Sequence, residues 1–214
     1  MIPGMSAAMN IIELPLFPLD LVLFPQGLLP LRIFEVRYLD MIKRCHQSST
    51  PFGVVSLTQG SQVQQAGSAQ ERFNRVGTLA RIIELDSPQP GLLHIRCQGE
   101  QRFSVQRSEK LRHGLWVADA ELLPSDVEVA VPADLQPTVQ MLRKVLKQLQ
   151  DKDVAADQMP MRPPYRFDDC AWVANRWCEL LPLPVEMKQQ LMTLDNPMVR
   201  LELVGDLLER SGWA

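Results

Sequence analysis

The side chains that could perform covalent or metal chemistry are few and widely separated in this chain. There are four cysteines and three histidines among 214 residues, and only Cys45 and His46 are neighbours. The cysteines, at positions 45, 97, 170 and 178, form no C-x-x-C pair, whereas structural zinc sites usually show closely spaced ligands. Disulfide frameworks are typical of short secreted chains. The sequence therefore predicts reduced, buried thiols in a cytoplasmic protein that binds no metal and no cofactor.

A catalytic site is not indicated by the remaining polar residues. A Ser-His-Asp set could be assembled from the three histidines, but no G-x-S-x-G turn is present. Glu35 and Arg37 flank the start of a helix beside Tyr38, where a perturbed carboxylate could act as a base. The alternative is an ion pair that fixes a strand-to-helix corner. His94, in an apolar run, is typical of a hydrogen-bonded strand histidine. We expect no catalytic residues and no enzymatic activity.

The most suggestive binding feature is a segment rich in proline and methionine, Met159 to Tyr165 (MPMRPPY). Flexible thioethers, an aromatic ring and a donor-rich cation are suited to contact with varied apolar peptides. The sequence therefore indicates peptide-binding candidates at Met159, Met161, Arg162 and Tyr165. The alternative is a plain linker, because proline-rich connections often serve as spacers.

Two partner classes are disfavoured. The net charge is −3, and no basic stripe interleaved with aromatic residues occurs, so nucleic acid is a poor match.

Residues 13–38 are strongly apolar, but four prolines and Asp20 interrupt them. A membrane-spanning helix tolerates such breaks only with compensation from neighbours. We therefore expect no membrane contact and interpret 13–38 as a buried, bent, extended segment that leads into a helix.

The elements that must position these residues divide the chain in two. Residues 10–124 contain at least six short apolar or β-rich runs and one amphipathic helix from Glu35 to His46. Gly99-Glu100 predicts a hairpin turn between Leu92–Gln98 and Gln101–Gln106, and 60–74 predicts a mobile loop. A sheet that closes into a barrel leaves none of its short strands with an unpaired edge, so the sequence predicts a small barrel. Residues 1–9 are expected to be a flexible tail.

Residues 133–214 are predicted to be helical. An apolar face runs through Asp134 to Gln150, and either Asp168 or Asp169 can cap a following helix that carries Trp172 and Trp177 in the core. Asn196-Pro197 is a strong start signal for the last helix. The predicted fold class is thus α+β, a β-barrel followed by a C-terminal α-helical bundle.

Several motifs in order carry a family resemblance. They are the apolar Pro-containing runs Leu14–Leu19, Val22–Pro25 and Leu29–Leu31, then Ile33–Tyr38, Phe52–Val55, Val76–Ile82, Gly99–Phe103, Leu180–Leu183, Lys188-Gln189, and Asp195 with Arg200-Leu201. Together they resemble the Lon protease N-terminal (substrate-binding) domain nearly end to end. The resemblance implies a PUA-like pseudo-barrel followed by a helical bundle. It supplies no catalytic residues.

The resemblance also implies a function. The sequence lacks the G-x-x-x-x-G-K-[ST] phosphate loop of an ATPase, and we expect a stand-alone copy without ATPase or peptidase modules. The expected function is non-catalytic binding of unfolded or peptide segments of client proteins. The alternatives are an RNA-binding PUA-like module, by fold analogy alone, and an adaptor or modulator of a full-length Lon protease. The sequence leaves open whether the chain forms a homodimer.

Overall fold

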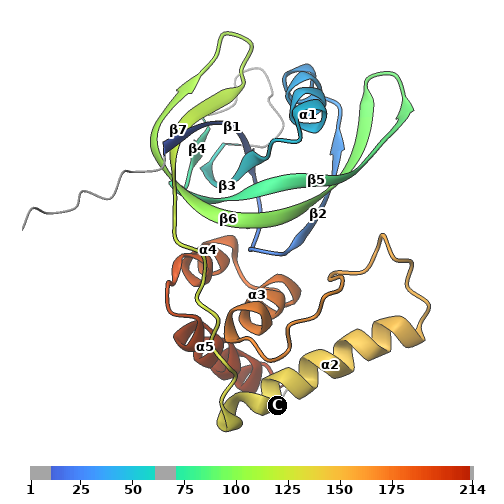
Figure 1. The fold of residues 1–214 in the computed structure, drawn as a ribbon, viewed down its shortest axis with the longest axis vertical. Coiled ribbons are helices and arrows are strands. Elements are labelled where there is room, and N and C mark those ends of the chain that lie inside the picture. Colours follow the sequence, from blue (N-terminus) through green and yellow to red (C-terminus); the bar gives the residue numbers. More distant parts are fainter. Residues whose placement is uncertain (1–10, 61–70, 213–214) are drawn as a thin grey trace, which may run out of the picture.

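The structure, a computed structural model, describes residues 11–60 and 71–212. A seven-stranded sheet comes first along the chain and four α-helices follow it (Figure 1). The strands are β1 Ile11–Leu19, β2 Leu28–Ile33, β3 Phe52–Gln59, β4 Arg72–Phe73, β5 Val76–Gln89, β6 Leu92–Lys110 and β7 Trp116–Leu122. The predicted α+β fold class is confirmed.

The sheet closes on itself. Neighbouring strands follow the order β1-β7-β6-β5-β3, and β3 also pairs in parallel with β1, with Leu16 opposite Gly53. β2 pairs outside this ring, along the first part of β6. Closure leaves the five ring strands without a free edge, so the predicted pseudo-barrel is confirmed.

The helix α1, Val36–Ser48, lies on the side of the barrel away from the C-terminal helices (Figure 1). Its apolar face joins barrel residues in one core, in which the rings of Phe17 and Tyr38 stack with centroids 3.9 Å apart. The apolar pattern of the sequence predicts eleven core residues. Ten of them are buried, namely Phe17, Val22, Leu23, Phe24, Ile33, Val54, Val55, Leu79, Ile95 and Phe103. The eleventh, Ile82, is partly buried against the core that contains Phe17.

The C-terminal part begins with a short 3-10 turn, Ala133–Leu135, and contains α2 Gln136–Asp151, α3 Cys170–Leu180, α4 Val185–Thr193 and α5 Pro197–Arg210. Asp169 accepts a hydrogen bond from the amide of Ala171 and Asn196 accepts one from that of Met198, so both predicted caps are confirmed. Trp172 and Trp177 are buried as predicted. Val22 and Phe24 belong to the helical core, so the segment after β1 ties the two layers together.

The predicted hairpin at Gly99-Glu100 is wrong. β6 runs without interruption through Gly99, and the turn lies earlier, at Gly91, which has a φ of 80°. A Cβ at Gly99 would lie 2.2 Å from the carbonyl oxygen of Phe24. This glycine therefore permits a close approach of the β1–β2 connection, and it does not form a turn.

Two other predictions fall partly or wholly outside the described residues. The tail 1–9 lies outside them, as do residues 61–70 of the predicted loop 60–74. Within that loop, Arg72 and Phe73 form the short strand β4 against β3, which patterning missed. The division into subdomains at 10–124 and 133–214 stays a prediction.

Candidate functional site

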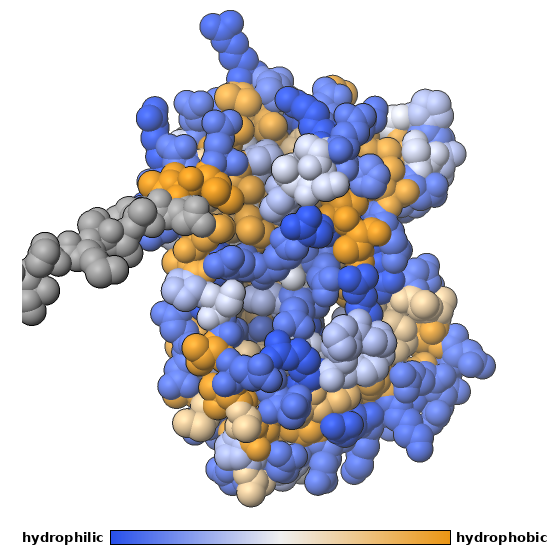
Figure 2. Space-filling view, in the orientation of Figure 1, coloured by the Kyte–Doolittle hydropathy of each residue, from blue (hydrophilic) through white to orange (hydrophobic). Residues whose placement is uncertain are grey.

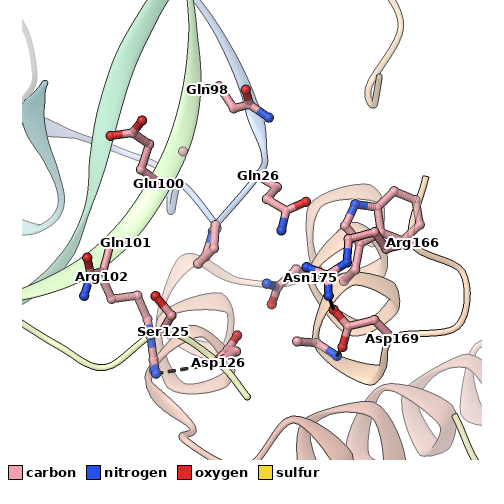
Figure 3. A pocket seen from close by; sticks show the side chains of 14 residues that line it. Gln26, Gln98, Glu100, Gln101, Arg102, Ser125, Asp126, Arg166, Asp169 and Asn175 are labelled. Atoms are coloured by element: carbon pink, nitrogen blue, oxygen red, sulfur yellow. Dashed lines mark hydrogen bonds and ion pairs between the residues drawn. The ribbon is translucent and has the colours of Figure 1, made fainter. Parts of the chain in front are cut away.

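A groove of about 430 Å³ lies between the barrel and the helices. In the orientation of Figure 2, mostly hydrophilic residues follow the boundary between these layers. Four stretches of chain line the groove: the β1–β2 connection, the middle of β6, the segment after β7, and the start of α3 with the residues before it (Figure 3). Their lining residues are Pro25, Gln26, Gln98, Gly99, Glu100, Gln101, Arg102, Ser125, Asp126, Arg166, Asp169, Ala171, Trp172 and Asn175.

Hydrogen bonds from both layers fix the position of the β1–β2 connection. The amide of Gln26 donates to the carbonyl of Gly99 at 2.8 Å, and the amide of Gly99 donates to the carbonyl of Gly27 at 2.8 Å. From α3, Arg176 donates to the carbonyl of Pro25 at 2.9 Å. Gln26 adopts a φ of 63° in this turn, an uncommon conformation for a residue with a side chain. The fold therefore holds the backbone of Gln26 at a fixed position beside the groove.

The charged groups of the groove are already paired. Arg102 contacts Asp126 at 3.3 Å and Asp195 at 3.0 Å. Arg166 contacts Asp169 at 3.2 Å, and Glu100 pairs with a β5 arginine, Arg81. A charged ligand would have to compete with these internal partners.

The neutral amides keep open hydrogen-bonding capacity. Gln98 accepts from Arg162 at 2.5 Å, Asn175 accepts from Arg200 at 2.9 Å, and Gln101 donates to the carbonyl of Leu123 at 2.6 Å. The Gln26 side chain makes no hydrogen bond to the described part of the chain, and in Figure 3 it lies between Gln98 and Asn175. The groove can therefore bind a ligand that both donates and accepts.

The electrostatics at the start of α3 are those of a structural cap. Burial raises the pKa of Asp169 above its ordinary value, against the opposing effects of Arg166 and the amide of Ala171. Asp169 is 3% exposed, and its carboxylate accepts the helix amide at 3.2 Å. This acid anchors the helix and is not free to take part in acid–base chemistry.

The other candidate residues for chemistry are structural. The Nε of Arg37 lies 3.1 Å from a Glu35 carboxylate oxygen, and the same guanidinium contacts buried Glu71, which supports the ion-pair interpretation. The prediction of a hydrogen-bonded His94 is wrong for its buried Nε2, which has no partner in the described chain.

Within residues 11–60 and 71–212, no group of three or more His, Cys, Asp or Glu side chains could hold a metal ion.

The sequence profile of a known family, the ATP-dependent protease La (LON) substrate-binding domain, matches residues 13–210. The chain belongs to this family. The match includes every strand after the start of β1 and every helix described above, and thus both walls of the groove. The predicted resemblance to the Lon substrate-binding domain is confirmed.

The curated relatives are named Lon proteases. The chain is 29% identical to the Lon protease of Anaeromyxobacter dehalogenans over 206 residues, and 27% identical to Lon protease 2 of Myxococcus xanthus over the same length. Each alignment covers 92% of this chain and 23% of the relative. The chain therefore corresponds to about a quarter of these relatives.

Solved structures of Lon N-terminal domains show the same fold. A Lon N-terminal domain protein from Xanthomonas campestris is 31% identical, with a TM-score of 0.67 over 91% of this chain and 97% of the other. The N-terminal domain of a Mycobacterium avium complex Lon protease has a TM-score of 0.57 with the same coverage of both chains. At 13% identity, the second likeness concerns the fold alone.

The predicted peptide-binding residues lie beside the groove of this Lon domain, not inside it. Met161 is buried, with 2% of its surface exposed, and belongs to the helical core. Met159 and Tyr165 are half-buried, and Arg162 is exposed and bonded to the groove residue Gln98. The ring of Tyr165 packs against Trp172 with centroids 6.2 Å apart. The peptide-binding role of these residues stays a prediction, and Met161 has almost no surface to offer.

Patterning missed the amides that line the groove. Gln26 lies in a short turn between proline and glycine, Pro25-Gln26-Gly27, where only the turn itself is visible in the sequence. Asn175 lies in an apolar helix, and the only hint of its role in the sequence is that an amide side chain occurs among apolar neighbours. Their convergence depends on contacts across more than a hundred residues and cannot be predicted from local spacing.

A second, more apolar surface lies on the far helices. Met187 of α4, Leu194 directly after it, and Leu203 and Leu207 of α5 line a hollow of about 340 Å³ together with polar neighbours. Leu203 is 41% exposed there. In the described parts of the chain, no helix is both long enough and apolar enough to cross a membrane.

Proposed function

We propose that this Lon substrate-binding domain is a non-catalytic module that holds unfolded or peptide segments of client proteins in the groove between the barrel and the helices. The observation that carries the proposal is the groove itself, in which amides with open hydrogen-bonding capacity face each other across two layers. The family match supports a protein as the ligand. The half-buried side chains of Met159 and Tyr165 provide adaptable apolar contacts next to it.

Fluorescence anisotropy tests this function with a labelled, permanently unfolded protein, titrated with the purified chain at low and high salt. We expect saturable binding that persists at high salt, because the groove's charges are internally paired. The natively folded form of the same probe is the control and should bind much more weakly. No binding of the unfolded probe up to about 100 µM, a free energy of about −5.5 kcal/mol, would overturn the proposal.

RNA is the rival ligand in this assay. A labelled structured RNA should bind weakly, since Arg102 and Arg166 are engaged by carboxylates. RNA binding that falls steeply with added salt would indicate phosphate contacts. That outcome, without binding of the unfolded protein, would replace the proposed function.

Partnership with a full-length Lon protease is a second proposal, supported by the 29% identity to a Lon protease. The proposed compartment is the cytoplasm, in line with four cysteines without disulfides. Adding the chain to a Lon degradation assay should change the rate at which an unfolded substrate is degraded. Sedimentation velocity on the same samples shows whether the chain forms a homodimer or binds Lon. An unchanged rate and no complex would exclude the partnership.

A further inference from the structure

We propose that the groove binds the main chain of an extended peptide through neutral side-chain amides, with Gln26 as the central contact. This inference rests on the proposed function and adds the chemical class that the groove recognises. A groove of this size can recognise charged groups, apolar side chains or hydrogen-bonding groups of a ligand. The contacts of its lining residues show which of these three classes it fits.

Structural partners fix the orientation of two amides. Arg162 and Arg200 can only donate, so the oxygens of Gln98 and Asn175 must face them, at 2.5 Å and 2.9 Å. The NH₂ groups of both side chains are then left with donor capacity. Neither makes a further hydrogen bond within the described chain, and both residues line the groove.

A third amide has the opposite polarity. The carbonyl of Leu123 can only accept, so the NH₂ of Gln101 faces it at 2.6 Å and its side-chain oxygen is left as an acceptor. The exposed hydroxyl of Ser125 can donate or accept. Gln26 has no structural partner for its amide and can rotate to present either group. The groove thus offers fixed donors, a fixed acceptor and one adaptable amide.

A peptide main chain matches this set. Each residue other than proline carries one N–H donor and one carbonyl acceptor, which complements a mixture of donors and acceptors without any net charge. A charged side chain would find no unpaired ion in the groove, because the arginines and acids there neutralise each other. Recognition of the main chain also explains how one groove could accept clients of unrelated sequence, since every unfolded segment carries the same backbone.

The conformation of Gln26 is the second observation. Turns that need a positive φ usually use glycine or asparagine, yet at a φ of 63° this turn has glutamine, followed directly by Gly27. Strained backbone positions concentrate at functional sites. A long amide at this position reaches into the groove, as Figure 3 shows, and a glycine there would serve the fold equally well but could not contact a ligand.

The test compares Gln26→Gly with Gln26→Asn, both of which suit the left-handed conformation. Glycine removes the amide and asparagine keeps it, and neither should lower the unfolding midpoint. The probes are the labelled unfolded protein and a short labelled peptide derived from it, made with and without N-methyl groups on alternate backbone nitrogens. We expect Gln26→Gly to weaken binding of both probes about three- to tenfold. Gln26→Asn, which keeps an amide on a shorter side chain, should weaken binding less than Gln26→Gly. N-methylation should weaken binding of the peptide at least as much as Gln26→Gly.

The outcomes separate this inference from the proposed function. If the wild-type chain binds the unfolded protein, but neither Gln26→Gly nor N-methylation changes the affinity, the main-chain site is wrong and client binding stands. If Gln26→Gly weakens binding and N-methylation does not, the groove reads side chains and the main-chain assignment is overturned. If the wild-type chain binds no unfolded protein, the proposed function itself fails.

Discussion

Asp126, in the segment after the barrel, holds Arg200 of the last helix at 2.7 Å and Arg102 of the barrel at 3.3 Å. The side chain of Arg200 is 1% exposed and that of Asp126 is 9% exposed. One carboxylate thus contacts two buried guanidinium groups, one from each layer. Asp126 and Arg102 also line the groove between these layers.

Replacing Asp126 with alanine should therefore destabilise the protein strongly. Removing one partner of a buried ion pair leaves an uncompensated charge, at a cost of about 3–5 kcal/mol. Chemical denaturation at neutral pH measures the change. Asp195→Ala is the matched control, because Asp195 also contacts Arg102 at 3.0 Å but its side chain is 90% exposed. Removing this exposed carboxylate should cost only about 0–1 kcal/mol, because Arg102 keeps Asp126 as a partner. Equal losses for the two variants would contradict the assignment.

The helical core provides a second comparison. Leu142 of α2 is fully buried among the helices, whereas Leu203 of α5 is 41% exposed. Leu142→Ala should cost about 2–5 kcal/mol through lost burial and a residual cavity. Leu203→Ala, the same substitution on the surface, should change the free energy of unfolding by about 0.5 kcal/mol or less. A small effect of Leu142→Ala in thermal or denaturant unfolding would mean that this core is poorly packed.

Sequence reasoning predicted most of the fold because the relevant signals are local. The cap at Asp169, the Asn196-Pro197 start of α5 and the apolar stripes of α1 and α2 act within one or two turns of a helix. The error at Gly99 has a physical reason. A glycine that gives room to the Phe24 carbonyl has the same sequence signature as a turn glycine, and only the tertiary contact distinguishes them.

The candidate site could be predicted only in outline. The segment 159–165 is conspicuous in the sequence and does lie beside the groove, through the Arg162–Gln98 contact. The groove residues themselves, such as Gln26 and Asn175, are isolated amides that converge from opposite layers. No spacing rule links positions so far apart, since only the packing of α3 against the β1–β2 connection brings them together.

The thiols provide a third prediction. Burial raises the pKa of both Cys97 and Cys178 to about 12, and it also raises the pKa values of Cys45 and Cys170. Because the thiolate is the reactive form, all four should react slowly with a thiol reagent at pH 8 in the native protein. After unfolding in guanidinium, all four should react at once, which a colorimetric time course measures. Fast reaction of any thiol in the folded chain would contradict its burial.

Glu71 should make stability depend on pH. Burial alone would raise the pKa of this carboxyl, but hydrogen bonds from Lys110 and Trp116 and the charge of Arg37 outweigh it, and the pKa is lowered from 4.5. The carboxylate accepts from Lys110 at 2.9 Å and from Trp116 at 2.7 Å. A lowered folded-state pKa adds stability that is present above the unfolded value and is lost as the pH falls through the folded value.

Glu71→Gln should therefore be less stable than the wild type by about 1–3 kcal/mol at pH 7. The difference should shrink below about pH 4.5, as the wild-type carboxylate takes up a proton on unfolding. Denaturant unfolding at a series of pH values measures it. The control is Glu109→Gln, an exposed site in the same part of β6 as Lys110, where the difference should be small at every pH. A Glu71→Gln deficit that stayed constant from pH 7 to pH 3 would show that the charge of Glu71 adds nothing and that its neutral hydrogen bonds account for the whole effect.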